Sequence, residues 1–356
     1  MGSGAIVPAC WGPIGDRASQ IARNTKVKIL VGWLADLHGK KHMVDQTLSW
    51  LLEDNQPAVR YRTLTDLMNL PESDPEVMIA RSAVPKRGWA ADILGRQKPG
   101  GHWESSRSLY RPKYTATNWM ALVLSDLGLT REDPRIAKTA ELFFDEWMDD
   151  EKENIFKDEV CIVGNAARFM TRFGYYDDPR VRRLFDRLLE DQKEDGGWHC
   201  WDSAKGTLDC WEALAAFAAI PKRKRTRKVK GSVERGIEFY LERKLFEEGR
   251  SKYLPWFRLH YPVHYYYDIL VGLDVVTALG FGGDERLKPS LEILNRKRHN
   301  GRWPLERVHP DPQSYAWGKH NRRQRTIPFA LEKVGGPSKW LTLTALKVQK
   351  KVAEAQ

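Results

Sequence analysis

Two kinds of segment alternate along the chain. In the first kind, apolar residues recur three and four positions apart with charged residues between them, which predicts helices with one exposed face. These are 44–55, 135–147, 181–192, 233–245 and 285–297. The second kind is apolar on most faces, which predicts buried helices. These are 115–129, 161–175, 209–220, 265–280 and 340–350, with a further one expected after Gln56.

A short turn motif separates the two kinds of segment. QKPGGHW ends at Trp103, QKEDGGW at Trp198 and KRHNGRW at Trp303. Weaker copies lie at 151–156, at 248–256 and around Gln56. Six copies with a period of roughly 40 to 60 residues indicate a repeat architecture of helix pairs.

A second motif marks where the exposed helices begin. The stretches SDPEV, EDPRI, DDPRV and GDERL start at Ser73, Glu132, Asp177 and Gly283. Aspartate accepts hydrogen bonds from the free N–H groups at a helix start, and proline suits the first helical position. Each repeat is therefore predicted to begin a helix at the Asp and to end it near the Gln/Gly/Trp turn.

Six helix pairs can stack as an open solenoid or close into a ring. An open array would leave the very apolar helices half exposed, so we expect an all-α (α/α)6 toroid. It forms one domain over 44–356, which follows an N-terminal extension, 1–43, and carries a basic loop, 221–231.

The Gln…Gly-Gly-Trp turns resemble the repeats of the squalene/hopene cyclase and protein prenyltransferase β-subunit superfamily. The resemblance covers most of 44–350 and implies the α/α toroid fold. The resemblance is weaker evidence for the reaction, because proteins with this fold catalyse several kinds of reaction. The Asp-x-Asp-Asp motif of the cyclases is absent, which disfavours a cyclase started by protonation.

Composition narrows the partners only in part. The net charge of +11 favours an anionic partner, and the run PKRKRTRKVKG at 221–231 offers either a solvated loop or a contact for nucleic acid or an acidic surface. No signal peptide or stretch of 18 apolar residues is seen, so we expect a cytoplasmic protein without a transmembrane segment. Four cysteines are too few for a disulfide scaffold, and we expect them to be reduced.

The first turns of parallel inner helices should converge at one end of the toroid, where free N–H groups favour anions and thiolates. Cys161, Cys210 and His264 are predicted at equivalent places on three successive inner helices, and Cys200 in the loop before the second of these. Three thiols and an imidazole match the ligand preferences of zinc. Each cysteine alone is also compatible with simple core packing.

The prenyltransferase β-subunits hold zinc with an Asp, a Cys two residues away, and a His on a following inner helix. By this resemblance the Asp corresponds to Asp209, the Cys to Cys210 and the His to His264 in HYYYDILVGL, while Lys205 stands where the family has a diphosphate-binding Lys. Asp209 and Cys210 are adjacent here, Trp211 replaces a Tyr, and two more thiols are present. The ligand set, and with it the chemistry, can therefore differ from that of the family.

The leading hypothesis is an enzyme with a zinc-thiolate site that acts on an apolar, lipid-like or other small substrate bearing an anionic group. Its expected residues are Cys161, Cys200, Cys210 and His264 for the metal, His264, Asp209 and Tyr267 for catalysis, and Arg168, Lys205, Asn118, Tyr114 and Trp211 for the substrate.

Three alternatives stay open. One is a polysaccharide lyase or glycoside hydrolase that uses Asn118, His264, Tyr267 and Arg168. Another is a lanthionine-forming cyclase type. The last is a non-catalytic binding protein with a structural zinc. The family works with a second helical subunit, which the sequence does not exclude.

Overall fold

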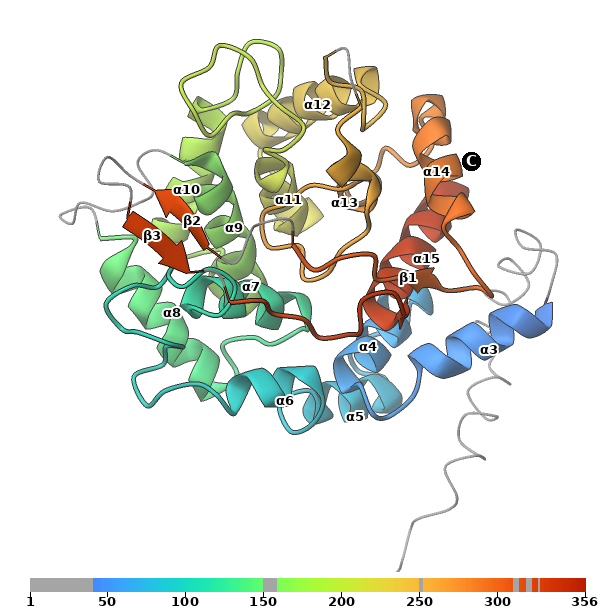
Figure 1. The fold of residues 1–356 in the computed structure, drawn as a ribbon, viewed down its shortest axis with the longest axis horizontal. Helices are drawn as coiled ribbons and strands as arrows, with labels where there is room; N and C mark the ends of the chain where they lie inside the picture. The colour runs from blue at the N-terminus through green and yellow to red at the C-terminus, as the bar shows by residue number, and fades with distance from the viewer. Residues whose placement is uncertain (1–40, 150–158, 250–251, 310–313, 318–321, 326) are drawn as a thin grey trace, which may run out of the picture.

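The computed structural model describes residues 41–149, 159–249, 252–309, 314–317, 322–325 and 327–356, and most of these are helical (Figure 1). The all-α prediction is thereby confirmed. The α-helices are α3 (Lys41–Leu51), α4 (Pro57–Arg62), α5 (Pro75–Ala83), α6 (Trp89–Leu94), α7 (Thr117–Asp126), α8 (Pro134–Glu146), α9 (Val160–Met170), α10 (Pro179–Glu190), α11 (Glu212–Ala219), α12 (Arg227–Glu242), α13 (Ile269–Leu279), α14 (Lys288–Arg296) and α15 (Lys339–Ala353).

Short elements complete the described chain. The π-helical turns η1 (Thr63–Leu67) and η3 (Thr171–Tyr175) extend α4 and α9, and the 3₁₀ turns are η4 (Lys222–Lys224), η5 (Leu254–Phe257) and η6 (Glu285–Leu287). Two small antiparallel pairs are formed by β1 (Trp303–Pro304) with β4 (Pro337–Ser338), and by β2 (Ser314–Trp317) with β3 (Arg322–Arg325). Among the described helices, none is long and apolar enough to cross a bilayer.

The predicted helix starts are confirmed. Asp74, Asp133 and Asp178 each accept a hydrogen bond from the backbone N–H two residues later, and each is followed by proline in the first turn of α5, α8 or α10. Asp284 accepts the same kind of hydrogen bond at η6, which leads into α14, but Glu285 follows it instead of proline. These caps satisfy N–H groups that have no partner inside the helix.

The turn motif hydrogen-bonds to the amphipathic helix that comes next along the chain. The side-chain amide of Gln97 donates to the carbonyl oxygen of Arg135 in α8 over 3.0 Å, and that of Gln192 donates to the carbonyl oxygen of Ser232 in α12 over 2.9 Å. The Trp residues that close the motif, Trp103, Trp198 and Trp303, each donate from Nε1 to a backbone carbonyl at the end of the preceding helix over 2.8 Å. Gly196 has a φ of 88°, and a Cβ there would lie 2.4 Å from the carbonyl oxygen of Arg235, so glycine is required.

Six helices, α4, α7, α9, α11, α13 and α15, are here called the core helices because most of their residues are buried. Contacts join α7 to α9, α9 to α11, α11 to α13, α13 to α15, and α15 to α4. Arg62 at the end of α4 donates from Nε to the carbonyl oxygen of Asp126 at the end of α7 over 3.2 Å. The other helices lie outside this set (Figure 1).

Two boundaries differ from the prediction. Helix α13 begins at Ile269, because Asp268 caps it and His264 has a φ of 52°, so His264 precedes the helix rather than occupying its first turn. Helix α11 begins at Glu212, which leaves Asp209 and Cys210 before it. Cys161, Cys210 and His264 were all expected in first helical turns, and of these only Cys161 lies within its helix, α9.

The basic run 221–231 is also not a loop throughout. Its first part contains the 3₁₀ turn η4, and residues from Arg227 onward form the first turns of α12, where Thr226 is the cap. Residues 1–40, which include Cys10 and most of the predicted extension, lie outside the described residues, as does the weak repeat copy at 151–156.

Candidate functional site

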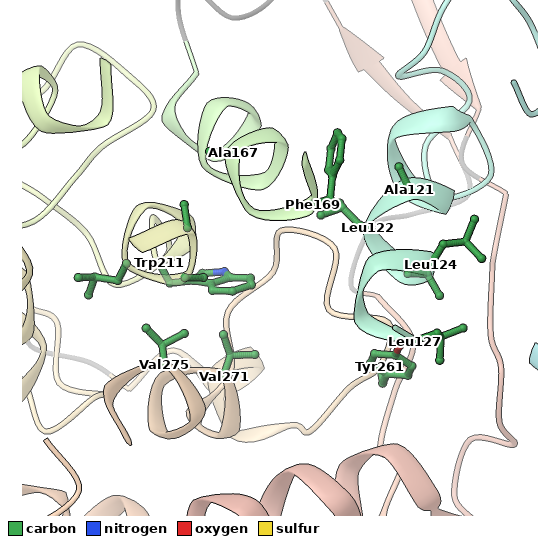
Figure 2. Close-up of a cluster of buried hydrophobic side chains, with 14 of the residues drawn as sticks. Ala121, Leu122, Leu124, Leu127, Ala167, Phe169, Trp211, Tyr261, Val271 and Val275 are labelled. Atoms are coloured by element: carbon green, nitrogen blue, oxygen red, sulfur yellow. The ribbon is translucent and has the colours of Figure 1, made fainter. Parts of the chain in front are cut away.

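A cavity of about 300 Å³ lies between the core helices, and each of them contributes to its wall. The contributions include Arg62 of α4, Asp126 of α7, Arg168 of α9, Ala215 of α11, Val271 of α13 and Thr344 of α15. Figure 2 shows Trp211, at the start of α11, facing Val271 and Val275 of α13, and all three residues line the cavity. This volume is at the lower end of the range for pockets that bind small molecules.

The cavity wall carries charged as well as apolar side chains. Two of its cations are paired: Arg172 forms an ion pair with Asp126, and Lys347 one with Asp274 over 2.8 Å. Arg168 differs, since its Nε and Nη2 atoms have no hydrogen-bond partner among the described residues although the residue is only 4% exposed. Burial lowers the pKa of Arg168 to about 10, and its guanidinium lies 4.9 Å from the centre of the Trp211 ring.

Three thiols gather beside this cavity. The sulfur atoms of Cys200 and Cys210 lie 3.4 Å apart, and the backbone N–H of Cys161 donates to Cys200 Sγ over 3.3 Å. All three cysteines are free thiols. The loop that carries Cys200 is closed at its base by the hydrogen bond from Thr207 N to Trp198 O, so the Gln/Gly/Trp turn fixes the position of this thiol.

The three thiols shift one another's pKa values. Hydrogen bonds from the Cys161 and Cys210 thiols lower the pKa of Cys200 to about 3. The same hydrogen bonds, together with burial, raise the pKa values of Cys161 and Cys210 well above the usual value. One thiolate, centred on Cys200 and supported by the N–H at the start of α9, is therefore favoured.

Glu212 is a buried acid that sequence reasoning did not include in the site. It is fully buried at the start of α11, and neither carboxyl oxygen has a hydrogen-bond partner among the described residues. Burial, with the nearby Cys200 charge as a second cause, raises its pKa well above the usual value. A protonated Glu212 is thus favoured beside the thiolate.

His264 lies next to the thiol-bearing elements but does not bond to a sulfur. Its backbone carbonyl accepts a hydrogen bond from Asn165 Nδ2 of α9 over 3.1 Å, while its ring stacks on Tyr114 and meets Trp119 edge-on. Neither ring nitrogen has a hydrogen-bond partner, sulfur included, among the described residues. Burial lowers the pKa of His264 well below its usual value, which favours the neutral imidazole.

The other predicted residues differ in burial and in their hydrogen-bond partners. Asn118 of α7 is buried, and its Oδ1 has no hydrogen-bond partner among the described residues. Asp209 is exposed and accepts a hydrogen bond from Trp256 Nε1 over 2.7 Å, and Lys205 is exposed in the loop after Cys200. The hydroxyl of Tyr267 donates to Leu245 O over 2.8 Å, and Tyr267 is not among the residues that line the cavity described above.

A buried imidazole–carboxylate pair in the cavity wall was missed from the sequence. His260 Nδ1 lies 2.7 Å from Asp268 Oδ2, and both residues line the cavity while being fully buried. Asp268 also accepts hydrogen bonds from the backbone N–H groups of His260, Leu270 and Val271. The signal in the sequence is slight, because the two residues lie eight positions apart in a non-helical segment.

Within the described part of the chain, no group of three or more His, Cys, Asp or Glu side chains is arranged closely enough to hold a metal ion. The three thiols described above are nevertheless of the residue type that commonly holds zinc. Comparisons with family models, curated proteins and solved structures found no match for the chain.

Proposed function

We propose that the chain is a closed (α/α)6 toroid, related to the cyclase and prenyltransferase superfamily, and that it is an enzyme with a zinc-thiolate site at one end of the central cavity. The successive contacts between core helices support the closed arrangement, as does a cavity to which all six contribute. The hydrogen bonds from Gln97 to α8 and from Gln192 to α12 support the repeat relationship.

The observation that carries the zinc proposal is the meeting of Cys161, Cys200 and Cys210, which come from a helix start, a loop and the segment before a second helix. Three sulfurs fit the donor preference of zinc, and a zinc ion with three protein ligands keeps an open fourth position. When bound there, zinc would activate a thiol, a hydroxyl or a water.

The substrate in this proposal is small or lipid-like, with an apolar body and an anionic group. Trp211 joins the two parts of the site, because it directly follows Cys210 and lines the cavity beneath Arg168. Apolar walls from α11, α13 and α15 suit the substrate body. Arg168 is the expected partner for its anionic group.

The alternative toroid function, a polysaccharide lyase or glycoside hydrolase, needs acid–base residues in a cleft. Its expected residues His264 and Tyr267 do not line the cavity described above, whereas Arg168 does. The gathered thiols would be incidental to a lyase, and for this reason we favour the zinc-thiolate proposal. A purely structural zinc would require a fourth protein ligand, and the fourth ligand expected from the sequence is His264.

Metal analysis of the purified full chain tests the proposal. We expect about one zinc per chain, lost when Cys161, Cys200 or Cys210 is replaced by serine and retained in the matched control Cys10→Ser. Retention of zinc in His264→Asn would assign the open fourth position, and its loss would assign a fourth protein ligand. A wild-type chain that binds no zinc after reduction and zinc addition would contradict the proposal.

A further inference from the structure

Three residues of the cavity wall leave buried polar atoms with neither a hydrogen-bond partner nor an ion-pair partner among the described residues, whereas Asp274, whose Oδ1 also lacks a hydrogen bond, is ion-paired with Lys347. These atoms are His260 Nε2, the Tyr261 hydroxyl, and Nε and Nη2 of Arg168, and none has a hydrogen-bond partner among the described residues. The residues are 0%, 1% and 4% exposed. Since an unsatisfied buried polar group is costly, their presence around one cavity points to a polar ligand that satisfies them.

The two unpartnered atoms of Arg168 define what kind of group fits. Nε and Nη2 form one edge of the planar guanidinium, and their N–H bonds point in parallel toward the same side. This edge matches two oxygens of a carboxylate or a phosphate. The plane is supported by the Trp211 ring, 4.9 Å away, so the edge is held in a defined orientation. Arg172 and Lys347 in the same wall are already paired with Asp126 and Asp274.

His260 has the opposite hydrogen-bonding character. Asp268 accepts from Nδ1 of the ring and from three backbone N–H groups, one of them that of His260 itself, so the imidazole is fixed in position. With the proton of the neutral ring on Nδ1, Nε2 carries a free lone pair. An imidazole oriented in this way by a carboxylate is suited to accept a proton.

We propose that the cavity is an acid–base site in which Arg168 binds a carboxylate or phosphate of a small ligand and His260 takes a proton from that ligand. A hydroxyl, thiol or acidic C–H of the ligand loses H⁺ and keeps the bonding electron pair. Nε2 forms the new N–H bond with its lone pair, and the resulting imidazolium is balanced by the Asp268 carboxylate. The inference rests on the proposed function only in treating the cavity as the substrate site, and it does not require zinc.

Binding of two simple anions to the full-length protein tests this inference and separates the two sources of the anionic group. The probes are inorganic phosphate and benzoate, and the readout is the NMR signals of ¹⁵N-labelled arginine and histidine side chains. We expect at least one probe to shift the Arg168 Nε–H signal saturably, and the one that does identifies phosphate or carboxylate as the preferred group.

The matched variants separate binding at Arg168 from a general charge effect. Arg168→Lys keeps the charge but lacks the two parallel N–H donors, and should weaken anion binding by about tenfold or more. Arg172→Lys, whose wild-type side chain is already ion-paired, should change anion binding by less than about threefold. His260 should show Nδ1 protonated and Nε2 free, with an Nε2 signal that shifts on anion binding in the wild type. His260→Asn, which retains a donor for Asp268, should still bind the anion.

Two results would overturn the inference: an Nε2 that is protonated in the free neutral protein, or Arg168 and His260 signals that neither anion shifts at its highest soluble concentration. Both are measured on the wild-type chain and need no variant to fold. Zinc content is measured on the same samples. Anion binding without zinc would contradict the proposed function alone, and zinc without anion binding would contradict this inference alone.

Discussion

The side-chain amide nitrogen of Gln192 lies 2.9 Å from the carbonyl oxygen of Ser232, so the end of α10 is hydrogen-bonded to α12. The same amide nitrogen donates to Gly196 O over 2.8 Å, and the side-chain oxygen Oε1 of Gln192 accepts a hydrogen bond from the Arg235 side chain. One side chain therefore holds both its own turn and the next outer helix. Gln97 makes the equivalent contacts with Gly101, Arg135 and Thr139.

Replacing Gln192 with methionine keeps the side-chain volume and removes these hydrogen bonds. We expect the free energy of unfolding to fall by about 1 to 3 kcal/mol, because two backbone carbonyls lose their donor. Urea denaturation measures this change. The control is Glu194→Met in the same turn, an exposed position where the change should stay within about 0.5 kcal/mol. Equal effects of the two substitutions would contradict a stabilising role for the Gln192 hydrogen bonds.

Gly164→Ala should separate two core helices. A Cβ at position 164 would lie 2.7 Å from the backbone carbonyl carbon of Glu212, so α9 and α11 could no longer approach as closely. We expect a loss of about 1 to 3 kcal/mol in the free energy of unfolding, as for other overpacked cores. Gly231→Ala in α12, where the nearest atom would lie 3.9 Å away, should instead stabilise the chain by about 0.5 to 1 kcal/mol. Thermal denaturation of both variants decides between these signs.

Glu212 should make the protein less stable as the pH rises. Its folded-state pKa is raised well above 4.5 by burial, so above that pH the unfolded chain releases a proton that the folded chain retains. The free energy of unfolding then falls with increasing pH, by at most about 1.4 kcal/mol per pH unit from this group. Glu212→Gln should remove that part of the slope in urea denaturation between pH 5 and 8, and the exposed Glu190→Gln should leave it unchanged. An identical slope in the wild type and Glu212→Gln would refute the assignment.

Alkylation should select Cys200 among the three clustered thiols. Its lowered pKa makes it the thiolate, while the pKa values of Cys161 and Cys210 are raised. In chelator-treated, reduced protein at about pH 6, iodoacetamide should therefore modify Cys200 first. Peptide mass spectrometry follows the order of modification, and zinc added beforehand should slow the reaction. Faster modification of Cys161 or Cys210 would contradict a thiolate centred on Cys200.

Much of the helix framework could be predicted because its signals are local. Asp133 followed by Pro134 marks a helix start through contacts within its own first turn, and the Gln192-to-Trp198 motif follows the end of one. The apolar character of 161–175 and 265–280 was enough to predict burial, and residues in these segments line the cavity or pack beside it. The meeting of Cys161, Cys200 and Cys210 followed from placing their segments at the same end of neighbouring core helices.

The positions of the other site residues depend on backbone turns and on helix packing, which the spacing of apolar residues in the sequence does not reveal. His264 was expected on a helix among the thiols, but its φ of 52° and the cap at Asp268 place it before α13, with its ring against Tyr114 and Trp119. The same non-helical segment brings His260 back onto Asp268, a contact between residues eight apart that no repeat pattern encodes. Glu212 was passed over because its full burial arises from the close approach of α9 at Gly164.

Helix α15 contacts α3 and α4, which belong to the first repeat, as well as α13. Lys350 donates to Asn69 Oδ1 over 2.7 Å, and Lys339 donates to Glu53 over 2.7 Å, so the last helix is tied to residues made almost three hundred positions earlier. During translation, the cavity therefore lacks one wall until α15 has left the ribosome. A chain stalled before Lys339 would leave apolar surfaces of α4 and α13 uncovered, and nascent chains of that length are where chaperone dependence should be greatest.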